Sequence, residues 1–180
     1  MTTIKVPDKY GYVILSCVVV PLFSFFYMGG SVMKARKEFN VQYPNLYATP
    51  GYHKQADEFN RVQRGHQNML ESWTTFTAAS LLGGLMHPIA VSIFGMLYSA
   101  GNILFLAGYS DAKLDVATAR YKKGGKYIIP SLGVLFISNV YFSCKLSCLW
   151  PARIGVIKHI GTLGAVGACI SLAGSMNGWW

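Results

Sequence analysis

Long apolar runs constrain this chain more than any other feature of its sequence. They cover residues 10–28, 89–109, 127–150 and 154–176. At about 1.5 Å per residue, each run is long enough to cross the roughly 30 Å hydrocarbon core of a bilayer as a helix. The first run lacks a convincing small-residue cleavage site, so we interpret it as a retained span and not as a signal peptide.

A further span is expected over residues 68–86, although its N-terminal half is unusually polar. His87 and Pro88 make a very short turn from this span into the next one. Pro151 breaks the helix that begins near residue 127, so residues 154–176 form a fifth candidate span. The sequence therefore predicts an all-α membrane protein with four spans and a fifth one after them.

The composition agrees with a membrane protein. Hydrophobic residues make up 52% of the 180 residues and charged residues only 13%, whereas a soluble domain carries about a quarter charged residues. The net charge of +9 could indicate a nucleic-acid partner. The basic residues, however, cluster in short stretches between apolar runs, as in membrane proteins with cytoplasmic loops. No nucleic-acid partner is therefore expected.

Two basic segments, residues 34–64 and 113–126, are interpreted as loops separated by the two spans of a hairpin. Both must then lie on the same side of the membrane, which the positive-inside rule makes the cytosolic or matrix side. The N-terminus is expected on the opposite side, and a fifth span would return the C-terminus to the basic side.

The cysteines are expected to be small, buried hydrophobic side chains. All four lie in apolar runs or at their edges: Cys17, Cys144, Cys148 and Cys169. None belongs to paired CxxC motifs at zinc-finger spacing, so no metal site is predicted.

The stretch FNRVQRGHQNMLE, residues 59–71, places polar groups directly ahead of an apolar run. Four of them, at helical spacing, would share one face: Arg61, Arg64, Asn68 and Glu71. Arg64 offers a planar fork for a carboxylate, and Glu71 could hold an ammonium group or pair with an arginine. A ligand with carboxylates, amides and one amine would match these groups.

Two interpretations of this stretch are open on residue types alone. The groups could form a polar site at the mouth of a membrane bundle, because charges near a membrane core are costly and generally face a bundle interior. They could also decorate a solvated helix start, with Arg61 and Arg64 reaching towards lipid phosphates.

The same stretch closely resembles the FNxxQRxHQNxLE signature of the microsomal glutathione transferase 3 subgroup of the MAPEG family. KARKEFNVQYPNLYA, GGLMHP and GYS further along the chain support the resemblance. It implies a four-helix transmembrane bundle over residues 1–150, followed by an extra helix over residues 151–180. It also implies a trimer, with glutathione as substrate bound between neighbouring subunits near the cytosolic face.

The resemblance implies roles for individual residues. Positions that match glutathione-binding residues of the family are Arg36, Arg64, Asn68, Glu71 and Tyr109. Lys37 matches a position near the second substrate. His66 and Gln67 belong to the signature, with no chemical step assigned to either.

Family catalysis uses an arginine at the start of the fourth helix, which favours the glutathione thiolate. The thiolate is the nucleophile, and a nearby cation lowers the thiol pKa. Arg120, in TARYKKGGKY, is the best match. The loop before it is longer than in typical members, so Lys122 or Lys123 could take the same place. The alternative is that these three basic residues are only exposed positive charges on a loop.

The chain departs from the family in two ways. Where the third helix usually reads GRxxYxxGY, this chain reads GNILFLAGY, so Asn102 replaces the arginine and Phe105 the tyrosine. Each lost charged hydrogen bond would cost about 1.5–3 kcal/mol, which together could weaken glutathione binding by about two orders of magnitude. The second departure is the fifth span, whose small residues suit helix packing and which could block the trimer contact.

Two functions are therefore kept open. The first is a membrane-bound glutathione transferase or glutathione-dependent peroxidase acting on lipophilic electrophiles or lipid hydroperoxides. The second is a non-catalytic accessory subunit of a larger membrane complex, for instance in the mitochondrial inner membrane. A lipid-binding or regulatory protein is a third, lesser interpretation. The resemblance implies an endoplasmic reticulum or mitochondrial membrane, with membrane lipid and either further copies or other subunits as partners.

Overall fold

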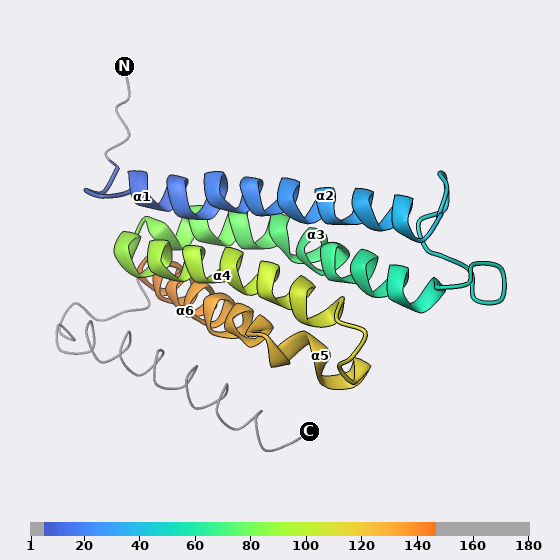
Figure 1. The fold of residues 1–180 in the computed structure, drawn as a ribbon. Coiled ribbons are helices and arrows are strands. Elements are labelled where there is room, and N and C mark those ends of the chain that lie inside the picture. The colour runs from blue at the N-terminus through green and yellow to red at the C-terminus, as the bar shows by residue number, and fades with distance from the viewer. Residues whose placement is uncertain (1–5, 147–180) are drawn as a thin grey trace.

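The computed structural model describes residues 6–146, and the regular structure within this range is all helical. The elements are α1 Gly11–Ile14, η1 Leu15–Val19, α2 Val20–Glu38, α3 Ala56–Gly84, α4 Pro88–Tyr109, α5 Val116–Lys122, η2 Gly125–Tyr127 and α6 Ile128–Leu146. Four long rods lie side by side: α1 to α2 taken together, then α3, α4 and α6 (Figure 1). The predicted all-α bundle is confirmed.

The first rod is continuous from α1 through α2, with a π-helical turn, η1, in its middle. In this turn the Val20 N–H donates to the Leu15 carbonyl, one residue further back than in an α-helix. Pro21 follows directly and has no N–H to donate. A π-helix usually occurs as one such widened turn inside an α-helix, and here the rod continues past the proline.

Three rods of the described part are long and apolar enough to cross a membrane: Gly11–Glu38, Pro88–Tyr109 and Gly125–Lys145. The second predicted span, residues 68–86, lies in α3 up to Gly84, and α3 is not among the three because it is too polar. Its 29 residues extend about 43 Å at 1.5 Å per residue, more than the roughly 30 Å hydrocarbon core. The polar N-terminal part of α3 can therefore project beyond the membrane.

The predicted basic loops are shorter than expected. α2 continues to Glu38 and α3 begins at Ala56, so residues 39–55 alone form the first loop. The second basic segment contains α5 and η2. Both connections nevertheless lie at the same end of the bundle, opposite the start of α1 (Figure 1), as the charge pattern predicted. The fifth candidate span, residues 154–176, lies outside the described residues.

The bundle core joins the first rod, α3, α4 and α6. Phe76 of α3 and Tyr98 of α4 stack with ring centroids 3.6 Å apart, and the Tyr98 hydroxyl lies 2.7 Å from Ser72 Oγ. α4 approaches the first rod closely at Gly95, where a Cβ would lie 2.4 Å from Cys17 Sγ. Cys17 is fully buried in this core, as expected of a small hydrophobic side chain.

Candidate functional site

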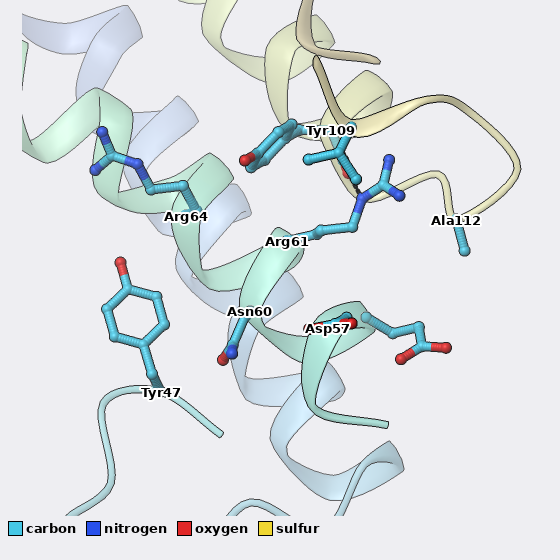
Figure 2. Close-up of a pocket in the computed structure, with 9 residues that line it drawn as sticks. Tyr47, Asp57, Asn60, Arg61, Arg64, Tyr109 and Ala112 are labelled. Carbon is cyan, nitrogen blue, oxygen red and sulfur yellow. Dashed lines mark hydrogen bonds between the residues drawn. The ribbon is translucent and has the colours of Figure 1, made fainter. Parts of the chain in front are cut away.

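A cavity of about 590 Å³ lies where the start of α3 meets the end of α4 (Figure 2). Its walls carry two arginines, two carboxylates and two tyrosines. The lining residues are Tyr47, Asp57, Glu58, Asn60, Arg61, Arg64, Tyr109, Ala112 and Val116. Of the residues predicted to bind glutathione, Arg64 and Tyr109 are among them. The cavity is thus a polar, charged space at the end of the bundle where the basic connections lie.

Arg64 and Glu71 form an ion pair, with Arg64 Nη1 2.5 Å from Glu71 Oε1. Residues seven apart lie two turns along one helix face, so α3 itself brings the two groups together. The side chains are 42% and 49% exposed, respectively, which leaves both accessible to a ligand. Pairing with an arginine was one of the two roles that the sequence left open for Glu71.

Asn68 lies between these two residues on α3 and is half-buried. Within residues 6–146 its side chain makes no hydrogen bond, so its amide is available to a ligand. The neighbouring Gln67 is occupied, because its Oε1 accepts a short hydrogen bond from the Tyr47 hydroxyl. The structure therefore brings Arg64, Asn68 and Glu71 together on one surface.

The loop of residues 39–55 is fastened to α3 beside this surface. The Asn60 side chain pairs with the Ala48 backbone, accepting from its N–H at 2.8 Å and donating to its carbonyl at 2.9 Å. With the Tyr47–Gln67 bond, this fixes the wall of the cavity that the loop supplies.

Arg36 holds this loop from the other side. Its Nη1 donates to the Asn45 carbonyl at 2.8 Å, and its guanidinium lies 4.4 Å from the centre of the Tyr43 ring. Arg36 does not line the cavity, and neither does the exposed Lys37. Among residues 6–146, no hydrogen bond or ion pair joins either of them to Arg64, Asn68 or Glu71.

Arg61 is the residue whose role the sequence interpretation missed. Its side chain turns away from Arg64 (Figure 2) and is only 9% exposed. Its Nε donates to the Tyr109 carbonyl at 2.6 Å, and its Nη2 donates to the carbonyls of Asp111 and Leu114 at 2.7 and 3.0 Å. Arg61 and Arg64 both line the cavity, but the Arg61 donors are occupied by backbone carbonyls some fifty residues away.

Arg120 lies on α5, and not at the start of the last helix as the resemblance implied. Its Cζ is 5.6 Å from the centre of the Tyr109 ring, while Arg61 Cζ is 5.8 Å from the same centre. Its Nε is buried and has no hydrogen-bond partner in the described part of the chain. Arg120 is therefore a half-buried cation beside a predicted site residue.

The two lysines near Arg120 differ from it. Lys123 Nζ is 2.8 Å from Asp111 Oδ2, and Lys122 is exposed. The Lys123 ammonium, together with the Lys113 N–H, holds the pKa of the Asp111 carboxyl below its usual range. This ion pair fastens the connection between α4 and the end of α5.

Asn102 and Phe105, the two departures on α4, are in the bundle core. Asn102 is fully buried and its Nδ2 donates to the Tyr98 carbonyl at 2.9 Å. Phe105 is 6% exposed and belongs to the same core cluster as Tyr98. Neither lines the cavity, so in the single chain the middle of α4 supplies no polar group to it.

Metal ligands are not gathered in the described range: no group of three or more His, Cys, Asp or Glu residues in it could hold an ion. The cavity contains two carboxylates, Asp57 and Glu58, but no histidine or cysteine.

Comparison with known proteins gives two findings. The model of the MAPEG family matches residues 13–137. Human microsomal glutathione S-transferase 2 is 29% identical over 117 residues, which cover 64% of this chain and 75% of the human protein. The more specific resemblance to the microsomal glutathione transferase 3 subgroup stays a prediction.

Proposed function

The chain belongs to the MAPEG family of membrane proteins, and from this premise we propose that it binds glutathione and transfers its thiolate to lipophilic acceptors. Three long apolar rods make it an integral membrane protein. The relative named above is a glutathione S-transferase. The observation that carries the proposal is the Arg64–Asn68–Glu71 surface beside the cavity.

The binding mode follows from the chemistry of these groups. A glutathione carboxylate would accept two hydrogen bonds from the guanidinium of Arg64, and the ammonium group would pair with the Glu71 carboxylate. A peptide amide would form a hydrogen bond with the Asn68 side chain. The Arg64–Glu71 ion pair holds both side chains at the surface before ligand arrives. Exposed ion pairs contribute little to stability, so a ligand that carries both charges can replace this one.

Arg120, whose guanidinium lies over the Tyr109 ring, would stabilise the deprotonated thiol of glutathione. A guanidinium favours the thiolate over the neutral thiol, because it stabilises only the charged form. The thiolate would then attack an electrophilic carbon, forming the C–S bond as the leaving group departs. With a lipid hydroperoxide it would attack the terminal oxygen and break the O–O bond, which releases the lipid alcohol and leaves a glutathione sulfenic acid; a second glutathione would then displace water to form the disulfide. Lipophilic acceptors can reach such a site laterally from the bilayer.

A second candidate function is a non-catalytic accessory subunit of a larger membrane complex. The burial of Asn102 and Phe105 in the core favours it, because the middle of α4 then supplies no charge or hydroxyl group to the cavity. The extra C-terminal segment, residues 151–180, would then pack against other subunits. An endoplasmic reticulum location suits the enzyme, and a mitochondrial membrane suits the subunit.

Two measurements on the full chain in mild detergent separate these functions. Calorimetric titration with glutathione should give a dissociation constant in the millimolar range or tighter, and the native mass should be that of a homotrimer. Binding lost in Arg64→Ala and kept in Lys54→Ala would support the proposed surface. Migration with a large complex, without glutathione binding, would establish the accessory role instead.

A further inference from the structure

We propose that Arg61 is a positioning residue for the reacting thiolate: it fixes the segment between α4 and α5 and thereby sets where Arg120 lies relative to Tyr109. The inference rests on the proposed function and deepens it, because it assigns a role to a buried arginine that touches none of the reacting atoms.

The first step is the local geometry at the end of α4. The last four carbonyls of an α-helix lack intrahelical donors. Arg61 satisfies the carbonyl of Tyr109, the last residue of α4, and two more carbonyls within the next five residues. A guanidinium can do this because its N–H groups point outward in one rigid plane. A lysine ammonium at the same place would lack that fixed fork.

The second step leads from this segment to Arg120. Leu114 is followed by Asp115, whose carboxylate caps α5 by accepting from the Thr118 N–H at 3.2 Å. α5 then packs directly on the end of α4: a Cβ at Gly108 would lie 2.4 Å from the Ala119 carbonyl oxygen. Arg120 is the next residue, with its guanidinium over the Tyr109 ring. Arg61 therefore anchors the beginning of the connection that places Arg120.

The third step is electrostatic. The effect of a cation on a thiol pKa falls with distance, and more gently in a half-buried site than in water. If the connection loosens, Arg120 no longer stays beside Tyr109, and the pKa of a bound thiol rises. Arg61 would thus control thiolate formation through Arg120, although its own donors are occupied by the backbone.

The test compares Arg61→Lys, which keeps the charge but loses the fork, with Lys113→Met, which removes an exposed charge from the same connection. The readout is the ultraviolet absorbance of glutathione thiolate on the full chain, followed against pH. We expect the midpoint to rise by about one pH unit in Arg61→Lys. Glutathione affinity above that midpoint should change less than twofold, and Lys113→Met should match the wild type.

A double-mutant cycle shows whether Arg61 acts through Arg120. When Arg120→Ala is already present, the thiolate midpoint is measured at alkaline pH. Adding Arg61→Lys should then cause no further shift in that midpoint. Amide hydrogen exchange of residues 110–115 should quicken in Arg61→Lys. If that variant does not fold, Asp115→Ala loosens the same connection and should raise the midpoint in the same direction.

Faster exchange with an unmoved midpoint would overturn the inference, and so would an equal shift in the Arg120→Ala background. A wild-type protein that forms no thiolate at all would mean that the proposed function itself fails. That outcome is distinguishable from a failure of the Arg61 inference, because it is seen in the wild type before any residue is substituted.

Discussion

Arg64 and Glu71 face each other across two turns of α3, with 2.5 Å between Nη1 and Oε1. The two charged groups best suited to a zwitterionic peptide thus neutralise each other in the free chain. Glutathione carries the same two kinds of charge, so it can take the place of the intramolecular pair without leaving either side chain unpaired.

Glu71→Gln should remove the preference for a ligand amine. In the wild type, deaminated glutathione should bind about tenfold more weakly than glutathione, because an ammonium–carboxylate bond is lost. In Glu71→Gln the two ligands should bind alike. Competition titrations measure both ratios, with Glu58→Gln as the control because that carboxylate also lines the cavity, whereas the ion pair of Arg64 in the described residues is with Glu71. A preference that survives in Glu71→Gln would place the amine elsewhere.

Phe105→Tyr should not restore glutathione affinity. Phe105 lies in the core cluster and does not line the cavity, so a new hydroxyl would be buried among apolar groups. We expect a change in dissociation constant of less than about twofold and a loss of about 1–3 kcal/mol in stability. Titration and thermal unfolding in detergent measure the two effects. Tenfold tighter binding would show that this position faces the ligand in the assembled protein.

Gly95→Ala should destabilise the bundle, because the new Cβ would lie 2.4 Å from Cys17 Sγ. Overpacking of this kind costs about 1–3 kcal/mol. Adding Cys17→Ala removes the sulfur and should recover part of the loss, leaving the contact with Ser16. Gly30→Ala is the matched control, since nothing lies within 4 Å of its Cβ position. Equal unfolding temperatures for Gly95→Ala and Gly30→Ala would contradict the packing of α4 on the first rod.

The connection between α4 and α5 should loosen in acid. Lys123 and the Lys113 N–H lower the pKa of Asp111 in the folded chain. A carboxyl with a lowered folded pKa stabilises the fold above its unfolded pKa, and that contribution is lost as the pH falls through the folded value. The protection of residues 110–115 from amide exchange, taken relative to the intrinsic exchange rate at each pH, should therefore fall below about pH 4. Asp111→Asn should exchange faster at neutral pH and lose this pH dependence; an unchanged profile would argue against the ion pair.

The helices that the sequence predicted best are those that are apolar throughout. Residues 89–109 were expected as a span, and α4 covers Pro88–Tyr109. The membrane span in this region was predicted from residue 68, with helical spacing already from Arg61, and residues 34–64 were interpreted as a loop; α3 begins at Ala56, because its first turns are polar and resemble a loop. Asp57 and Glu58 in that first turn suit the positive end of a helix dipole, a signal that the basic residues obscured.

The site was predictable only where one helix builds it. Regular spacing predicted that Arg64, Asn68 and Glu71 share a face, and the structure agrees. The role of Arg61 depends on carbonyls of Asp111 and Leu114, fifty residues away, which side-chain patterns do not report. The short helix α5 was missed as well, although Asp115 three residues before Thr118 is a recognisable cap.

The ultraviolet absorbance of glutathione thiolate, measured at neutral pH on the full chain during titration with glutathione, tests the central claim most directly. We predict a saturable thiolate signal in the wild type, its loss in Arg120→Ala with glutathione affinity largely kept, and its persistence in Lys122→Ala. Saturable glutathione binding without any thiolate signal in the wild type, or a signal unaffected by Arg120→Ala, would contradict the assignment of Arg120 and the chemistry built on it.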